Sequence, residues 1–262
     1  MHEAHTLSNS GFLLLFFIMI VTYIGAGISS SKRKQLQKWP LHRYVFWTMG
    51  VLSIAIALVG PLAERSFTDF RAHMVGHLLL GMLGPLLLAL AAPITLILRS
   101  LPVMSARRVS RVLRSNSFQV LSDPMITSIL NVGGLWILYT TGLYTAMHEN
   151  LFLHLFVHVH VFLAGYVFTA SIVYIDPIAH RRSYVYRSIV LLMALTGHGV
   201  LSKYIFANPP SDVSKDHAEI GAMIMYYGGD IVDAVIIVIL FYQWFKKTNP
   251  RALFMFNKQT ST

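Results

Sequence analysis

Residues 73–98 read HMVGHLLLGMLGPLLLALAAPITLIL and contain no Asp, Glu, Lys or Arg. A bilayer core about 30 Å thick is crossed by a helix of about 20 apolar residues, so this stretch is long enough to span a membrane. His73 and His77 stand four residues apart at its start, which places both imidazoles on one face of a helix. The stretch therefore predicts a transmembrane helix with a histidine-bearing face near one end.

Six more apolar runs of similar length flank this stretch. The seven predicted spans cover residues 11–28, 44–61, 73–98, 125–144, 151–175, 188–207 and 220–245. The first run has no basic segment before it and no small-residue cleavage site after it, so we do not expect a cleaved signal peptide. The chain is 55% hydrophobic and 12% charged, whereas soluble domains carry about 25% charged residues. We therefore expect an all-α integral membrane protein, a single membrane domain (1–262) folded as a seven-helix bundle.

The basic residues predict how this bundle is oriented. Cytoplasmic loops of membrane proteins are enriched in Lys and Arg, and 17 of the 21 basic residues here fall on alternate loops and the C-terminal tail. They are Lys32, Arg33, Lys34, Lys38, Arg43, Arg99, Arg107, Arg108, Arg111, Arg114, Arg181, Arg182, Arg187, Lys246, Lys247, Arg251 and Lys258. This alternation predicts an external N-terminus and a cytoplasmic C-terminus. The Arg-rich connection, residues 99–123, is expected to carry an amphipathic surface helix.

Charge and cysteine content narrow the possible partners. The net charge of +10 comes mainly from the predicted cytoplasmic loops, which lie next to the anionic membrane lipids of the inner leaflet. These lipids account for the charge, so we expect no nucleic-acid partner. The chain has no cysteine, which excludes thiolate metal sites and disulfides.

Ten of the twelve histidines fall outside or in the predicted outer half of the membrane. They are His2, His5, His73, His77, His148, His154, His158, His160, His198 and His217, whereas His42 and His180 fall on the cytoplasmic side. A lone intramembrane histidine is often an interhelical hydrogen-bond donor. A cluster contributed by at least four helices favours a functional site, because intramembrane ionisable residues are rare and usually functional.

Helical spacing indicates which histidines act together. His73 and His77, and likewise His154 and His158, are four residues apart and share a face. His160 points about 160° away from His158, so one straight helix cannot direct all three of its imidazoles at one ion. One of them must hydrogen-bond or face a second site. The predicted metal ligands are His73, His77, His154, His158, His160 and His198.

The ligand types favour copper. Imidazole suits copper, zinc and iron, and thioether sulfur selects Cu(I). Met74, Met147, Met223 and Met225 lie at the same predicted level, although ordinary apolar packing is the alternative interpretation of these methionines. Haem is the alternative cofactor, because histidines on facing helices can ligate a b-type haem.

Carboxylates add two further possibilities. Asp230 lies about 15 Å into the last span, and Asp233 is expected near the level of Asn131. These two aspartates form either interhelical hydrogen bonds or a proton or ion relay. A further alternative is that the protein is a zinc hydrolase, in which Asp216 or Glu219 would lie beside a zinc ion held by three ligands. The possible additional ligands are Met74, Asp216, His217, Met223 and Asp230.

Several motifs together resemble a known family. The segment from His73-Met-Val-Gly-His77 to Gly84-Pro85 and Ala92-Pro93 is similar to the His-Met-x-x-His segment of the CtaG-type, multi-span cytochrome c oxidase assembly factors. The later matches are His160-Val-Phe-Leu-Ala-Gly165-Tyr166, Asp176-Pro177, His198, Asp216, Gly221 and Gly229-Asp230. The resemblance covers about residues 69–245. Leu78 stands where many members carry Met, and His217 stands where Gln is common.

The resemblance implies a chaperone-like role rather than an enzymatic one. It implies a multi-pass protein of the bacterial cytoplasmic membrane that helps to mature a haem-copper oxidase. The expected partners are an oxidase subunit and a copper donor, with copper passed by ligand exchange through an outward-facing His/Met cluster. The alternative is a membrane redox or hydrolytic enzyme that uses haem or zinc at the same histidines.

Overall fold

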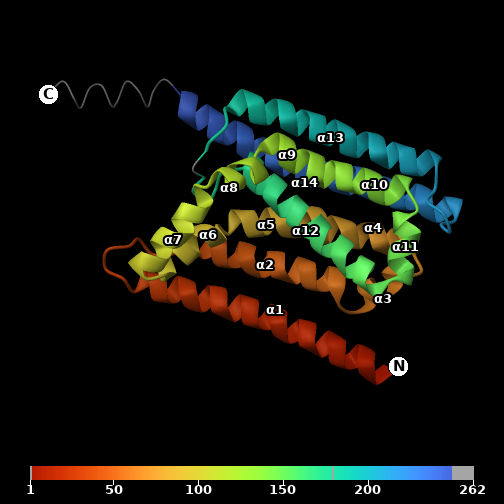
Figure 1. Ribbon diagram of the computed structural model, residues 1–262, viewed down its shortest axis with the longest axis horizontal. Coiled ribbons are helices and arrows are strands. Elements are labelled where there is room, and N and C mark those ends of the chain that lie inside the picture. Colours follow the sequence, from red (N-terminus) through yellow and green to blue (C-terminus); the bar gives the residue numbers. More distant parts are fainter. Residues whose placement is uncertain (1, 179, 250–262) are drawn as a thin grey trace.

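Apolar helices run side by side along one axis, and no strand occurs in residues 2–178 and 180–249, which this computed structural model describes (Figure 1). The long helices are α1 (His2–Ser31), α2 (Leu41–Leu58), α12 (Leu151–Ile172), α13 (Tyr184–Ala207) and α14 (Lys215–Thr248). Two more rods are built from consecutive segments: α4 (Phe70–Leu78), η1 (Leu79–Leu83) and α5 (Gly84–Leu90), then α9 (Pro124–Ser128), η2 (Ile129–Gly133) and α10 (Gly134–Thr140). The short helices are α3 (Pro61–Ser66), α6 (Pro93–Ser100), α7 (Val103–Leu113), α8 (Asn116–Leu121) and α11 (Leu143–Glu149).

Six helical stretches of the described chain are long and apolar enough to cross a membrane. A seventh is added if Pro124–Thr140 and Leu143–Glu149, which meet at 80°, count as one broken span. Large side chains on α1, such as Leu14 and Phe17, are 60% and 63% exposed, as expected of an apolar face that contacts lipid. The predicted all-helical, multi-pass architecture is confirmed, with six or seven candidate spans.

Proline and glycine move several predicted boundaries. The third span ends at Leu90 rather than residue 98, because Ala92 is left-handed (φ 54°) and Pro93 has no N–H with which to continue the helix. The second span covers Leu41–Leu58 rather than 44–61, between Pro40 and Gly60, whose φ is 90°. The fourth stops at Thr140 rather than residue 144, at the 80° bend, and the fifth stops at Ile172 rather than residue 175.

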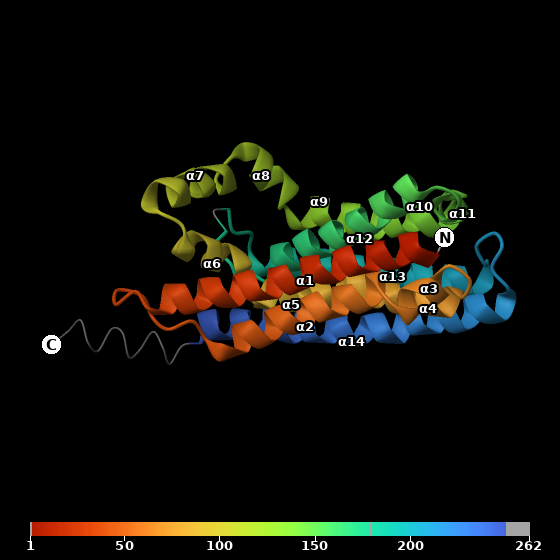
Figure 2. The same ribbon diagram turned by 90° about the horizontal axis from the view of Figure 1, so that it is seen from below.

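The two ends of the bundle differ in charge. The loop between α1 and α2, the helices α6 and α7, and the end of α14 gather at one end, on the left of Figure 1. This basic end holds the segments that the sequence predicts to be cytoplasmic. Figure 2 shows α7 and α8 standing beside the bundle here, between α6 and α9. The amphipathic helix predicted in residues 99–123 is present as α7.

Helix α12 approaches the α4–η1–α5 rod unusually closely. A Cβ atom on Gly165 would overlap the carbonyl oxygen of Gly81 in η1. Small residues allow such backbone-to-backbone approach between membrane helices. On the other side of the rod, α4 packs against α14, which in turn packs against α13. The histidine-bearing helices α4, α12 and α13 are thereby drawn together around one interior.

Candidate functional site

Helix α4 buries its histidine face at the end of the bundle opposite α7. His73 and His77 are each 7% exposed. Nε2 of His73 shares a 3.0 Å hydrogen bond with the hydroxyl of Tyr139, which comes from α10. Rings of Phe70 and Tyr144 also pack on His73, with centroids 5.9 and 5.1 Å from its own. An aromatic wall therefore holds the first imidazole of this helix in place.

His77 meets His198 of α13 in the interior. Their ring centroids are 6.3 Å apart, and Nε2 of each ring is buried without a hydrogen-bond partner. Both rings line a cavity of about 30 Å³, together with Asn131, Thr169 and Asp233. Buried polar atoms are normally satisfied, so two such nitrogens at one small polar cavity point to a function or a bound species.

Two glycines make room for this pair of rings. A Cβ atom on Gly229 of α14 would lie 2.7 Å from Cε1 of His198. A Cβ atom on Gly81 would lie 3.3 Å from Cε1 of His77. Real Cβ atoms do not approach other atoms as closely as the first distance, so His198 keeps its position only because residue 229 has no side chain.

Helix α12 adds two further imidazoles. The ring centroids of His154 and His158 are 4.2 Å apart. Nδ1–H of His158 donates to the carbonyl oxygen of His154 at 2.8 Å, which leaves Nε2 as the nitrogen with a free lone pair. His158 lines a cavity of about 20 Å³ together with His73 and His77. Nδ1 of His154 is buried without a partner, and its ring stacks on Phe67.

His160, a predicted ligand, lies outside this arrangement. Its Nε2–H donates to the carbonyl oxygen of Leu130 at 3.1 Å, on the other side of α12. Leu130 lies in the π-helical segment η2, and Gly134 leaves room for the ring, since a Cβ atom there would lie 2.5 Å from Nε2. Of the three histidines on α12, His160 is thus the one that hydrogen-bonds elsewhere.

An open pocket of about 460 Å³ covers the outermost part of the site. His148, Glu149, Asp212 and His217 contribute to its lining. Nδ1 of His217 lies 3.6 Å from Oδ1 of Asp69. The ring of His148 is 6.2 Å from that of His73 and 6.3 Å from that of His154. The pocket therefore connects to the buried imidazoles through His148.

Asp69, at the edge of this pocket, is held as an anion. Its carboxylate caps α4 by accepting the backbone N–H of Arg71 and also accepts the guanidinium of that residue. The Arg71 side chain, with its backbone N–H, lowers the pKa of Asp69 from 3.8 to about 2. The ion pair with Arg71 offsets this negative charge, and the carboxylate also lies beside His217.

The additional candidates divide by their position. Met74 is fully buried in an apolar core with Phe70 and Met225, which is the environment that the packing interpretation expects. Met223 is 42% exposed on the outer surface of the bundle. Asp216 is exposed and does not line the pocket that His217 lines. Asp230 faces outward, and Asp233, at 5% exposure, is the aspartate that reaches the interior beside Asn131.

Six of these histidines, three buried and three half-buried, form a chain rather than one compact cluster. We call His148, His154, His158, His73, His77 and His198 the histidine chain. No group of three or more His, Cys, Asp or Glu in the described part of the protein is placed to hold one ion. These imidazoles meet mainly in pairs, and the expected His/Met metal site stays a prediction.

Sequence reasoning missed several residues of this site. Tyr139 and Tyr144 were hidden among ordinary apolar residues of the fourth span, and no periodic pattern singles them out. His148 is expected outside the membrane from the sequence, and its place at the end of that span is the signal that could single it out. Gly81 follows His77 by four residues, and Gly229 packs against His198 of a neighbouring helix. The need for glycine at these positions becomes visible only when the helices are packed together.

Comparison with known proteins identifies the family. The family model for the cytochrome c oxidase caa3 assembly factor (Caa3_CtaG) matches residues 21–247. An uncharacterized protein of Mycobacterium leprae (strain TN) is 28% identical over 242 residues, which cover 84% of this chain and 37% of that protein. The chain thus spans little more than a third of the length of this relative. No solved structure matches. The family resemblance predicted from the sequence is confirmed, and the chain belongs to the cytochrome c oxidase caa3 assembly factor family.

Proposed function

We propose that this protein takes up copper at the α3–α11 end of the bundle and delivers it to a subunit of a haem-copper oxidase. The observation that carries the proposal is the pair His77 and His198, which line a common small cavity and whose Nε2 atoms are buried without a hydrogen-bond partner. Metal–imidazole bonds of about 2 Å, with the ring radii added, put two rings on opposite sides of a linear two-coordinate ion roughly 6 Å apart. The 6.3 Å between these centroids agrees with that value.

The pairwise arrangement suits Cu(I) as cargo. Imidazole is a good copper ligand, and Cu(I) accepts low coordination numbers. A cargo ion must also leave, and a site with few ligands retains an open position for an acceptor. Structural zinc sites, by contrast, are almost always closed by four ligands, and catalytic ones use three protein ligands. The described residues contain no such group of three.

The histidine chain supplies steps between the outer pocket and the interior. Neighbouring ring centroids are separated by 6.3 Å from His148 to His154 and by 4.2 Å from His154 to His158. His158 shares one cavity with His73 and His77, and His77 shares the next with His198. This series of rings would let an ion pass inward from one imidazole to the next by ligand exchange.

The charge pattern supports an orientation in which this route opens to the outside. Positively charged segments gather at the opposite end, around α7, and such segments are characteristic of the cytoplasmic side. We therefore infer that the N-terminus is external, that the C-terminus is cytoplasmic and that the protein resides in the bacterial cytoplasmic membrane. Its partners would be an external copper donor and the oxidase subunit, in a role that is not enzymatic.

Metal analysis with an absorbance spectrum of the purified protein tests this function. Incubation with Cu(I) should load copper, and His77→Ala should lower the bound copper while His160→Ala and His180→Ala should not. A Soret band would instead favour the haem alternative. Stoichiometric zinc without copper would favour the hydrolase. The cavities beside His77, at about 20 and 30 Å³, are far smaller than a haem.

A further inference from the structure

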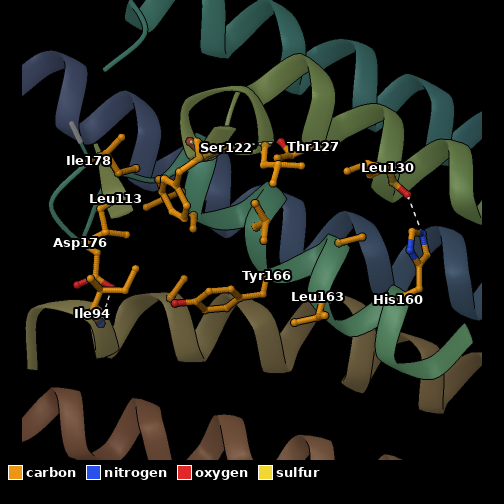
Figure 3. A pocket seen from close by; sticks show the side chains of 18 of the residues that line it. Ile94, Leu113, Ser122, Thr127, Leu130, His160, Leu163, Tyr166, Asp176 and Ile178 are labelled. Atoms are coloured by element: carbon orange, nitrogen blue, oxygen red, sulfur yellow. Dashed lines mark hydrogen bonds between the residues drawn. The ribbon is translucent and has the colours of Figure 1, made fainter. Parts of the chain in front are cut away.

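A long apolar groove runs down the outside of the bundle toward its basic end. It encloses about 500 Å³ between α12, the α9–η2 rod and the α5–α6 region. Figure 3 shows its length, from His160 and Leu130 at one end to Asp176, Ile94 and Ile178 at the other. Leu163 and Tyr166 lie along its wall. Apart from a few hydroxyl groups, its lining offers no polar partner over most of this length.

The dimensions of the groove match one leaflet of a bilayer. From His160 to the end of α12 at Ile172 the helix rises about 18 Å. Half of a bilayer core is about 15 Å thick. The groove therefore extends from near the membrane midplane to the interface at the basic end, which is the depth that one acyl chain occupies.

The groove leads directly to a basic basin. Leu113 of α7 and Phe118 of α8 line the groove toward the end that holds Asp176. Helix α7 also lines a second cavity, of about 780 Å³, with Arg107 and Arg111, and Arg114 directly after the helix lines it too. Pro177 lines both cavities, so the apolar groove and the basic basin are adjoining parts of one surface.

The three arginines of this basin have no acidic partner among the described residues. The other two arginines there are already engaged: Arg33 donates to the carbonyl oxygens of Arg99 and Ser100, and Arg99 donates to Ser30 and Gln37.

The nearby carboxylates are engaged as well. Asp123 pairs with Arg182 at 2.6 Å and accepts from the hydroxyl of Tyr186. Asp176 accepts the backbone N–H groups of Ile94 and Thr95 and the Thr95 hydroxyl. The basin thus presents positive charge that no side chain of the described protein neutralises.

We propose that this surface binds one anionic phospholipid of the leaflet at the basic end. Its phosphate would lie among Arg107, Arg111 and Arg114, and one acyl chain would lie in the groove. Guanidinium groups bind phosphate oxygens through paired hydrogen bonds, and basic clusters next to a membrane concentrate anionic lipids. The binding surface is separate from the histidine chain and does not depend on copper.

Lipid titration of the full-length protein in detergent tests the proposal. Native mass spectrometry should show one phosphatidylglycerol retained at concentrations where phosphatidylcholine of the same chain length is lost. The double variant Arg111→Gln/Arg114→Gln should lower phosphatidylglycerol affinity about tenfold or more. Arg108→Gln is the matched control, because Arg108 lies on the same helix but does not line the basin, and it should bind as the wild type does.

A groove variant tests the acyl-chain part. Ala170→Phe, which fills the groove without altering charge, should weaken binding of both lipids. Equal retention of the two lipids by the wild type would overturn the proposal, as would equal losses from Arg108→Gln and the double variant. Unchanged lipid binding by Ala170→Phe would also overturn the proposal. It would mean that the ligand contacts only the arginines, as an ion or a peptide would, and does not occupy the groove. Copper binding should be unchanged in all of these variants, which separates this test from that of the proposed function.

Discussion

His77 on α4 and His198 on α13 line the same small cavity, with ring centroids 6.3 Å apart and both Nε2 atoms buried without a hydrogen-bond partner. The two residues are far apart in sequence and meet because α14 packs against both of their helices. Glycines at positions 81 and 229 keep side chains away from the two rings. The predictions below follow from this pair and its surroundings.

Gly229→Ala should displace His198 and weaken copper binding. The added Cβ atom would lie 2.7 Å from Cε1 of His198, so the ring must move or the helices must separate. Overpacking of this kind costs about 1–3 kcal/mol of stability. The thermal unfolding midpoint and the Cu(I) affinity should both fall. Gly25→Ala, where a Cβ atom meets nothing within 4 Å, is the control and should change neither. Unchanged Cu(I) affinity in Gly229→Ala would count against a role for His198.

Tyr139→Phe should destabilise the protein while leaving the His77 and His198 pair in place. The change removes the hydroxyl that bonds Nε2 of His73 and leaves a buried nitrogen unsatisfied, at a cost of about 1–3 kcal/mol. Thermal unfolding should show the loss. Tyr227→Phe, at a side chain that is 64% exposed, should have no effect. Equal stability of the two variants would mean that the Tyr139 hydroxyl contributes nothing in the folded protein.

Asp69→Asn should change the acid stability of the protein. The pKa of Asp69 falls from 3.8 to about 2, chiefly because of its hydrogen bond with the Arg71 side chain. A lowered folded-state pKa stabilises the protein above the unfolded value, and this contribution is lost as the pH falls through the folded value. The wild type should therefore exceed Asp69→Asn in unfolding midpoint by a constant amount above about pH 4 and by progressively less toward pH 2. A difference that grows as the pH falls would contradict this assignment.

The orientation can be tested with accessible tags on intact cells. A tag inserted between α7 and α8, or appended to the C-terminus, should be protected from external protease. A tag placed before Ser10 should be cleaved. The prediction follows from the 17 basic residues on alternate loops and the tail. Cleavage of the C-terminal tag on sealed cells would reverse the orientation and would direct the outer pocket to the cytoplasm.

The sequence predicted the spans better than it predicted the site. Apolar length alone located the helices, and Pro93 explains why the third ends early. Spacing on α12 showed that one histidine must point elsewhere, but identifying it as His160 required the position of the Leu130 carbonyl in a π-helical segment. The choice between Asp230 and Asp233 depends on how α14 is rotated about its axis. Such rotation is set by contacts between helices, which a single sequence does not encode in any local pattern.

The central claim is that His77 and His198 bind the same copper ion, and a double-mutant cycle of Cu(I) affinity tests it most directly. The four proteins are the wild type, His77→Ala, His198→Ala and the double variant, with His160→Ala as the matched intramembrane control. Ligands of one ion act as a unit, so each single variant should lose at least about tenfold in affinity and the double variant little more than either single one. A shared site would be contradicted if the losses in Cu(I) binding free energy of the two single variants simply add in the double variant. It would also be contradicted if both single variants bind Cu(I) as tightly as His160→Ala does.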